Sequence, residues 1–138
     1  MYEFFEHTAD IGLRVRAATL EELFAHAGRG LLALLVDEPD SVRSVQSLTI
    51  RLQSDSVEQL FYDWLNELLY IFETRRLLLG RFEVRLTGDL TSLEAQAWGE
   101  PLDPQRHRLG PEVKAATYHE LMVQRRDDGW FAQAILDI

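Results

Sequence analysis

The residues that could do chemistry gather near the two ends of the chain. Residues 7–10, with the sequence His-Thr-Ala-Asp, bring an imidazole, a hydroxyl and a carboxylate together. At the other end, we expect Asp137 and Ile138 to present a carboxylate side chain beside a terminal carboxylate. Two or three converging oxygen anions repel one another unless a hard cation such as Ca²⁺ or Mg²⁺ neutralises them. The alternatives are a polar turn at the first motif and a frayed end at the second.

Composition narrows the chemistry that these groups could support. The chain has no cysteine, which excludes disulfides, thiolate ligands and cysteine nucleophiles, so any metal must bind oxygen or imidazole. The sequence contains no G-x-S-x-G nucleophile elbow, no Walker loop, no G-x-G-x-x-G fingerprint and no H-E-x-x-H motif. Residue chemistry therefore indicates one hard-metal site and does not by itself name a function.

Length and charge limit where such a site could work. The 138 residues, of which 46% are hydrophobic and 27% charged, are typical of one globular domain, which we expect to span residues 1–138. Because the sequence lacks a membrane-length apolar run and a signal peptide, we expect a soluble, cytoplasmic protein with no membrane partner. A net charge of -9 disfavours direct RNA binding by the isolated protein, although Arg75-Arg76 and Arg125-Arg126 leave local patches open.

Two amphipathic helices must help to position these groups. Each helix begins at a hydroxyl residue that can cap it, Thr19 with Glu22 three residues later and Ser56 with Gln59 three residues later. Apolar residues recur at helical spacing behind both caps. The first stripe comprises Leu20, Leu23, Phe24, Ala27, Leu31, Leu34 and Leu35, and the second Val57, Leu60, Phe61, Trp64, Leu65, Leu68, Leu69 and Phe72.

Alternating apolar and polar residues predict the strands that these helices cover. The expected strands lie at residues 11–17, 48–52, 82–86, 93–97, 113–124 and 130–138, and a short strand before Asp10 is a further option. Gly88-Asp89 and Asp127-Asp128-Gly129 are turn signals, and residues 99–111 form a long loop. We therefore expect a single-domain α+β fold in which two helices pack on one face of a mixed β-sheet.

The long loop and the strand after it hold further polar candidates. Residues 98–108 concentrate Gly, Pro, Asp and His, so they could carry function or could equally be a solvated connector. Lys114 and Tyr118 share a face of the following strand, whereas His119 points the opposite way. As a catalytic base, His119 is no better supported than a histidine of the core or of a sheet edge.

Three separated motifs and the chain ending resemble the archease family. The similarity runs through the whole chain, and the combination is far more specific than any single motif. The residues that carry it are His7-Thr8-Ala9-Asp10-Ile11-Gly12, Trp98-Gly99-Glu100-Pro101 with Arg106-His107, Val113-Lys114-Ala115-Ala116-Thr117-Tyr118-His119 and Leu136-Asp137-Ile138.

The resemblance implies a role in RNA ligation without catalysis. Archeases are accessory factors of the RtcB-type RNA ligase, which joins RNA ends in tRNA splicing and RNA repair, and they promote its GTP-dependent guanylylation and multiple turnover. The family's metal ligands carry over to Asp10, Asp137 and Ile138, with calcium as the expected ion and magnesium or manganese as alternatives. His7, Glu100 and Lys114 are candidates for support or for contact with the ligase.

Two other functions stay open at this point. A stand-alone metal-dependent phosphohydrolase would use Asp10 and Asp137 to hold an ion and His7 or His119 as a general base. A chaperone-like module that binds RNA or protein would use the basic pairs and exposed aromatic side chains instead. The net charge argues against the version that binds RNA.

Overall fold

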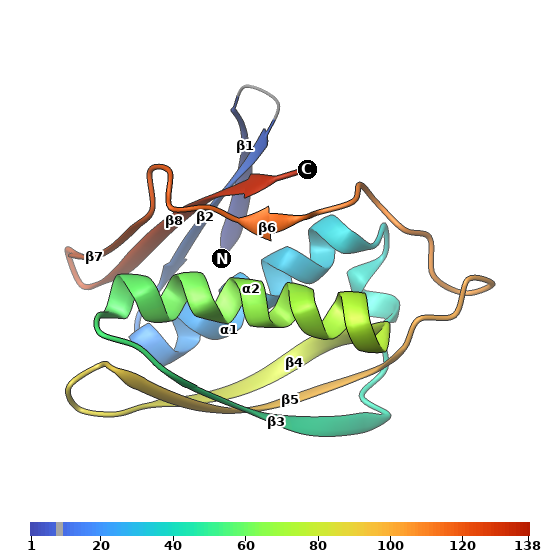
Figure 1. Cartoon of the computed structure of the whole chain (residues 1–138), viewed down its shortest axis with the longest axis horizontal. Helices are drawn as coiled ribbons and strands as arrows, with labels where there is room; N and C mark the ends of the chain where they lie inside the picture. The colour runs from blue at the N-terminus through green and yellow to red at the C-terminus, as the bar shows by residue number, and fades with distance from the viewer. Residues whose placement is uncertain (8–9) are drawn as a thin grey trace.

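The computed structural model describes residues 1–7 and 10–138, apart from the side chain of His7. Its elements follow one another from a hairpin at the N-terminus to a long strand at the C-terminus (Figure 1). In chain order they are β1 (Tyr2–His7), β2 (Asp10–Ala17), α1 (Leu20–Leu35), the 3₁₀ turn η1 (Pro39–Ser41), β3 (Gln46–Gln53), α2 (Val57–Arg75), β4 (Leu77–Leu86), β5 (Ser92–Pro101), β6 (Ala115–Ala116), β7 (Met122–Arg126) and β8 (Gly129–Asp137).

The strands form two antiparallel sheets, with the two helices between them (Figure 1). The larger sheet has the order β1-β2-β8-β6, and β7 also pairs with β8. The smaller sheet has the order β3-β5-β4. The α+β class with two helices is confirmed, and the expected single mixed sheet is corrected to two antiparallel sheets.

The extensive burial of α1 explains why a single sheet could not cover this helix. Eleven of its 16 residues are buried, including Ala25 and Gly30 outside the expected stripe. The helix contacts β2 of the larger sheet and β4 of the smaller one. A helix that is apolar on most of its circumference needs cover on opposite sides, and the second sheet supplies it.

Both expected helix starts are confirmed. The Thr19 hydroxyl accepts a hydrogen bond from the Glu22 backbone N–H at 3.2 Å, and the Ser56 hydroxyl accepts one from Gln59 at 3.1 Å. The helices are joined in the core by Trp64, whose indole N–H donates to the Phe24 carbonyl at 2.9 Å. Because a buried indole N–H needs a partner, this bond favours the observed crossing of the helices.

The segment from 113 to 124 differs most from its expected structure. Instead of one long strand, it forms the two-residue strand β6, a turn and then β7. Glu120 in the turn has a left-handed φ of 52°, which interrupts the extended backbone. Thr117 and Gln133 stabilise this break, because Thr117 donates to the Ile135 carbonyl and Gln133 donates to the Glu120 carbonyl, each at 3.0 Å. The optional strand before Asp10 is present as β1.

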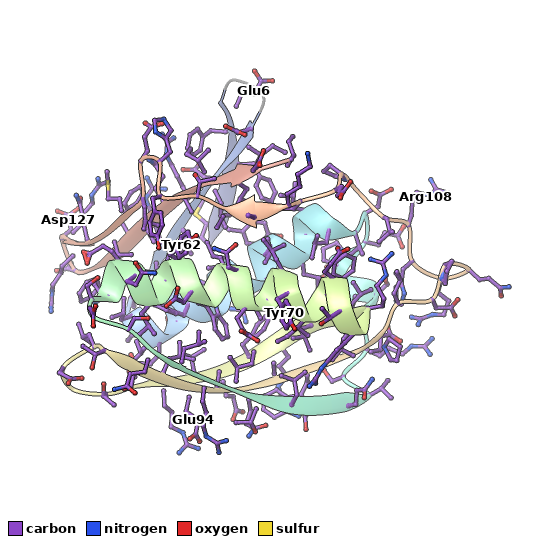
Figure 2. All side chains as sticks on the ribbon, in the orientation of Figure 1. Glu6, Tyr62, Tyr70, Glu94, Arg108 and Asp127 are labelled. Carbon is purple, nitrogen blue, oxygen red and sulfur yellow. The ribbon has the colours of Figure 1, made fainter. Side chains whose placement is uncertain are left out.

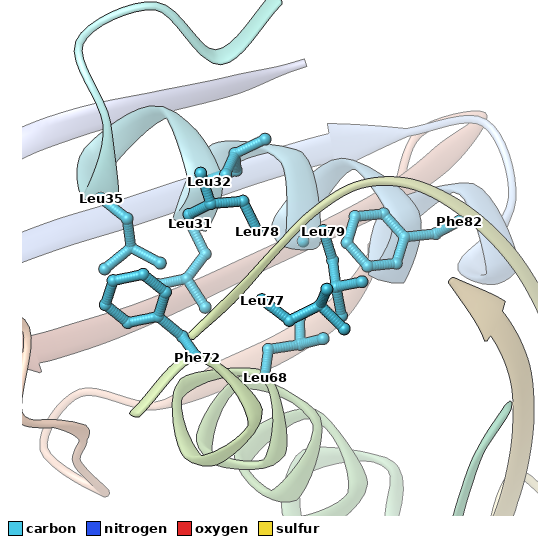
Figure 3. A pocket seen from close by; sticks show the side chains of 10 residues that line it. Leu31, Leu32, Leu35, Leu68, Phe72, Leu77, Leu78, Leu79 and Phe82 are labelled. Carbon is cyan, nitrogen blue, oxygen red and sulfur yellow. The ribbon is translucent and has the colours of Figure 1, made fainter. Parts of the chain in front are cut away.

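A narrow hollow in the core lies between α1, α2 and β4 (Figure 3). Its lining consists of glycine, leucine and phenylalanine only. Because it offers no polar or titratable side chain, it belongs to the packing of the core and not to a site. Neither helix in the described residues is both long and apolar enough to cross a membrane.

Candidate metal centre

The fold brings the two ends of the chain side by side. Strands β2 and β8 are antiparallel neighbours, and their register sets Asp10 directly opposite Asp137. Residues that face each other in an antiparallel pair project from the same face of the sheet, with Cβ atoms roughly 4.5–5.5 Å apart. The two carboxylates therefore share one surface, although they come from opposite ends of the sequence.

This surface is the outer face of the larger sheet, the one turned away from the helices. Leu13 and Val15 of β2 are fully buried on the inner face, so Asp10, which is an odd number of residues away from both, lies on the other face. Asp10 is half-buried and Asp137 is exposed. Gly12, two residues from Asp10 on the same face, lies under the ring of Phe5, where any side chain would collide with that ring.

A third strand adds a cation to this end of the sheet. Ala115 of β6 is opposite Asp137, and the Lys114 backbone N–H donates to the Asp137 carbonyl at 2.8 Å. Lys114 is exposed, and it is the only lysine in the sequence. The structure therefore brings together Asp10, Asp137, Ile138 and Lys114, which come from three separate motifs.

The donor set fits part of the coordination shell of a hard ion. Two carboxylates on one face offer the oxygen ligands that Ca²⁺ and Mg²⁺ prefer. Among the described side chains, which do not include that of His7, no group of three or more Asp, Glu or His residues could hold a metal. Further ligands would therefore have to come from Ile138 oxygens, water or a partner. His7 pairs with Asp10 through the backbone, and its side chain lies outside the described residues.

Glu100 lies in β5 of the smaller sheet, where its side chain bonds residues of the long loop. Its side chain is largely buried and accepts hydrogen bonds from the Arg106 guanidinium at 2.7 Å and from the Arg43 backbone N–H at 2.8 Å. The buried His107 ring lies 3.1 Å away. Burial alone would raise the pKa of Glu100, but the hydrogen bonds from Arg106, Arg43 and His107 outweigh it and lower the pKa to about 2.

Backbone hydrogen bonds also hold the loop to the end of α1, from the Asp37 N–H to the Arg108 carbonyl at 2.9 Å and from the Gly110 N–H to the Leu35 carbonyl at 2.8 Å. Figure 2 shows Arg108 of this loop and Asp127 of the β7–β8 turn on opposite sides of the view. The loop begins later than residue 99, where it was expected, because β5 continues to Pro101. His119 is exposed in the turn after β6, where its ring lies 3.3 Å from the Glu120 carboxylate.

One polar residue near the candidate site has no signature in the sequence. Asn66 of α2 uses its side-chain amide to bond both backbone groups of Ala116 in β6. Its position beside the apolar stripe of α2 gives no sign of this contact, because β6 is distant in the sequence. The only available signal is that Asn66 is the single asparagine in the chain.

The comparisons with known proteins agree on one family. The model of the Archease protein family (MTH1598/TM1083) matches residues 2–138. Protein archease of Pyrococcus furiosus is 37% identical over 140 residues, which cover 99% of this chain and 98% of the relative. Protein archease of Methanosarcina acetivorans is 36% identical over 140 residues, which cover 99% of this chain and 95% of the relative.

Two solved structures share the fold. The solution structure of Methanobacterium thermoautotrophicum protein 1598 has a TM-score of 0.87 and 32% identity, and the match covers 99% of this chain and 98% of that one. The crystal structure of an archease and possible chaperone from Thermotoga maritima has a TM-score of 0.68 and 22% identity, with 100% and 98% covered. The second likeness concerns the fold alone.

Proposed function

The chain belongs to the archease family, and on that premise we propose that it is a non-catalytic activator of an RtcB-type RNA ligase. It promotes GTP-dependent guanylylation and multiple turnover of the ligase in tRNA splicing and RNA repair, in the cytoplasm. The observation that carries the proposal is the register of β2 and β8, which pairs Asp10 with Asp137. That pairing supports a divalent-metal site at the end of the larger sheet.

In this proposal each residue at the end of the sheet has a defined task. The carboxylates of Asp10 and Asp137 hold the ion, and Ile138 adds a backbone or carboxylate oxygen. A bound divalent ion supplies positive charge that can bridge to phosphate oxygens. Lys114, whose backbone N–H bonds the Asp137 carbonyl, offers a flexible cationic side chain suited to contact a phosphate or an acidic group of the ligase.

The charge of the molecule favours a protein partner over free RNA. The net charge of -9 repels a phosphate backbone, whereas a ligase that binds RNA must present cationic surface. An acidic protein can approach such a surface with favourable long-range electrostatics. Calcium is the expected ion, with magnesium or manganese as alternatives.

The direct test is transfer of guanylate from labelled GTP to a cognate ligase in a single turnover. Wild-type protein is expected to increase the rate of transfer, and Asp137→Asn to remove most of that increase. Asp128→Asn serves as a matched control, because this exposed aspartate lies in the turn at the opposite end of β8. Equal stimulation by wild type and Asp137→Asn would contradict the assigned role of the site.

A further inference from the structure

Strand β6, with two residues, is the shortest strand of the larger sheet. It pairs with β8 through only two residues, Ala115 opposite Asp137 and Ala116 opposite Leu136. One backbone hydrogen bond to β8 flanks it on each side, from the Lys114 N–H to the Asp137 carbonyl at 2.8 Å and from the Thr117 N–H to the Ile135 carbonyl at 3.0 Å. Lys114 comes directly before this strand and bonds Asp137 through its backbone, so the placement of β6 sets where Lys114 lies relative to Asp137.

The other edge of β6 is covered by one side chain of α2. The Ala116 N–H donates to Asn66 Oδ1 at 2.9 Å, and Asn66 Nδ2 donates to the Ala116 carbonyl at 3.2 Å. The same Nδ2 also donates to the Tyr62 carbonyl one helical turn earlier, at 3.2 Å. The amide of Asn66 thus bonds the strand as a neighbouring strand would, while it stays anchored to its own helix.

Burial makes these bonds hard to replace with water. Ala116 is 2% exposed, so its backbone groups depend on partners within the protein. Asparagine offers one acceptor and two donors on a short side chain, and all three are used here. Aspartate would keep the acceptor and lose the donors, and leucine would fill the space without bonding either group.

We propose that Asn66 is a positioning residue of the archease site: by holding β6 against α2, it sets Lys114 beside Asp137. The consequence for metal binding and ligase activation rests on the proposed function, whereas the hold on β6 does not. The hydrogen bonds of Asn66 go to Tyr62 and Ala116, so its effect on the carboxylates passes through the backbone of residues 114–116.

The sequence provides a clean probe for this proposal. Because Lys114 is the only lysine, protein labelled with ¹⁵N-lysine gives a single backbone amide signal, from the N–H that bonds the Asp137 carbonyl. Its hydrogen-exchange rate reports local opening of β6. Asn66→Leu is expected to speed this exchange about tenfold or more, because two buried backbone groups lose their partners. Asn66→Asp keeps the acceptor, so its Lys114 exchange rate is expected to lie between the rates of wild type and Asn66→Leu.

A control on the same helix separates this effect from a general loss of stability. Thr74→Val removes a hydroxyl that bonds the Tyr70 carbonyl of α2, and it should leave Lys114 exchange unchanged. Urea unfolding of each variant shows whether the whole fold is weakened. Where Asn66→Leu does not fold, the comparison is made with Asn66→Asp. Unchanged Lys114 exchange in the folded variant would overturn the proposal.

The second readout tests positioning. With global stability matched, the Asn66 variant is expected to bind calcium more weakly, as followed by the Lys114 signal, and to stimulate guanylylation less than Thr74→Val does. Faster exchange with wild-type calcium affinity and stimulation would overturn the positioning role. If the wild type did not bind calcium or stimulate the ligase, the proposed function would be contradicted. The comparison of exchange rates would still decide whether Asn66 holds β6.

Discussion

At the scale of single residues, the site depends on side chains that no local pattern connects. Asp10 and Asp137 become neighbours only through the pairing of β2 with β8. Residue chemistry could predict oxygen ligands and a hard ion from the sequence, because cysteine is absent and carboxylates occur at both ends. It could not predict that the carboxylates share a face, since that requires the register between two strands distant in the sequence.

The first prediction concerns metal-dependent stability. Calcium is expected to stabilise the wild type against urea, by about 2.7 kcal/mol when its concentration is about 100 times the dissociation constant. Asp10→Asn and Asp137→Asn should lose most of this gain, because each removes a charged ligand, and Asp128→Asn should retain it. Unfolding curves in calcium and in chelator measure the difference. Equal calcium stabilisation of all four proteins would contradict the assignment of the ligands.

The second prediction concerns Glu100 and pH. Because its pKa is lowered to about 2 from an ordinary value of 4.5, its ionised form stabilises the fold above that ordinary value, and the contribution is lost as pH falls toward 2. Glu100→Gln should therefore lower the free energy of unfolding by about 1–3 kcal/mol at neutral pH. The difference in free energy of unfolding between wild type and Glu100→Gln should become smaller below pH 4.5.

Urea unfolding of Glu100→Gln at a series of pH values between neutral and acid checks this behaviour. Glu94→Gln is the matched control, because Glu94 forms an exposed ion pair with Arg51 on the outer face of the smaller sheet. Figure 2 shows its side chain pointing away from the helices. Such a pair contributes about 0–1 kcal/mol. If the stability lost in Glu100→Gln relative to wild type stayed constant with pH, this would argue against the role of the ionised carboxylate.

At the scale of elements, capping and turn residues in the sequence correctly predicted the helix starts and the hairpin turns, which depend on local interactions. The caps at Thr19 and Ser56 mark where the helices begin, and the turn signals mark the β4–β5 and β7–β8 hairpins. The division into two sheets was not predictable, because it depends on which distant strands pair. The break after β6 was hidden for a similar reason, since it is stabilised by side-chain bonds between Thr117 or Gln133 and distant backbone groups.

The third prediction tests the close approach of β4 and β5. A Cβ atom on Gly99 would overlap the Leu78 carbonyl and lie 2.9 Å from Leu79 Cα, where the register of the two strands shifts. Gly99→Ala should therefore destabilise the protein by about 1–3 kcal/mol. Gly88→Ala, in the open turn of the same hairpin, should be neutral or gain about 0.4–1 kcal/mol. Thermal or urea unfolding separates the two, and equal effects would mean that the backbone contact is absent.

At the scale of the whole molecule, the site lies at one end of the larger sheet and is framed by the C-terminal segment, β6 and the β1–β2 hairpin (Figure 1). The long loop that Glu100 holds connects β5 of the smaller sheet to β6 of the larger one. In the proposed role, this end of the sheet presents the two carboxylates to a partner. The net charge of -9 disfavours independent capture of RNA and, under the proposed function, favours approach to a cationic protein surface.

The most direct test of the activator role is RNA ligation by a cognate RtcB-type ligase under multiple-turnover conditions, with GTP and divalent metal. Wild-type protein is expected to raise the number of RNA joints formed per ligase molecule, and to join no RNA without the ligase. Asp10→Asn and Asp137→Asn should lose most of the stimulation, and Asp128→Asn should keep it. No stimulation by the wild type, or full stimulation by both site variants, would contradict this role.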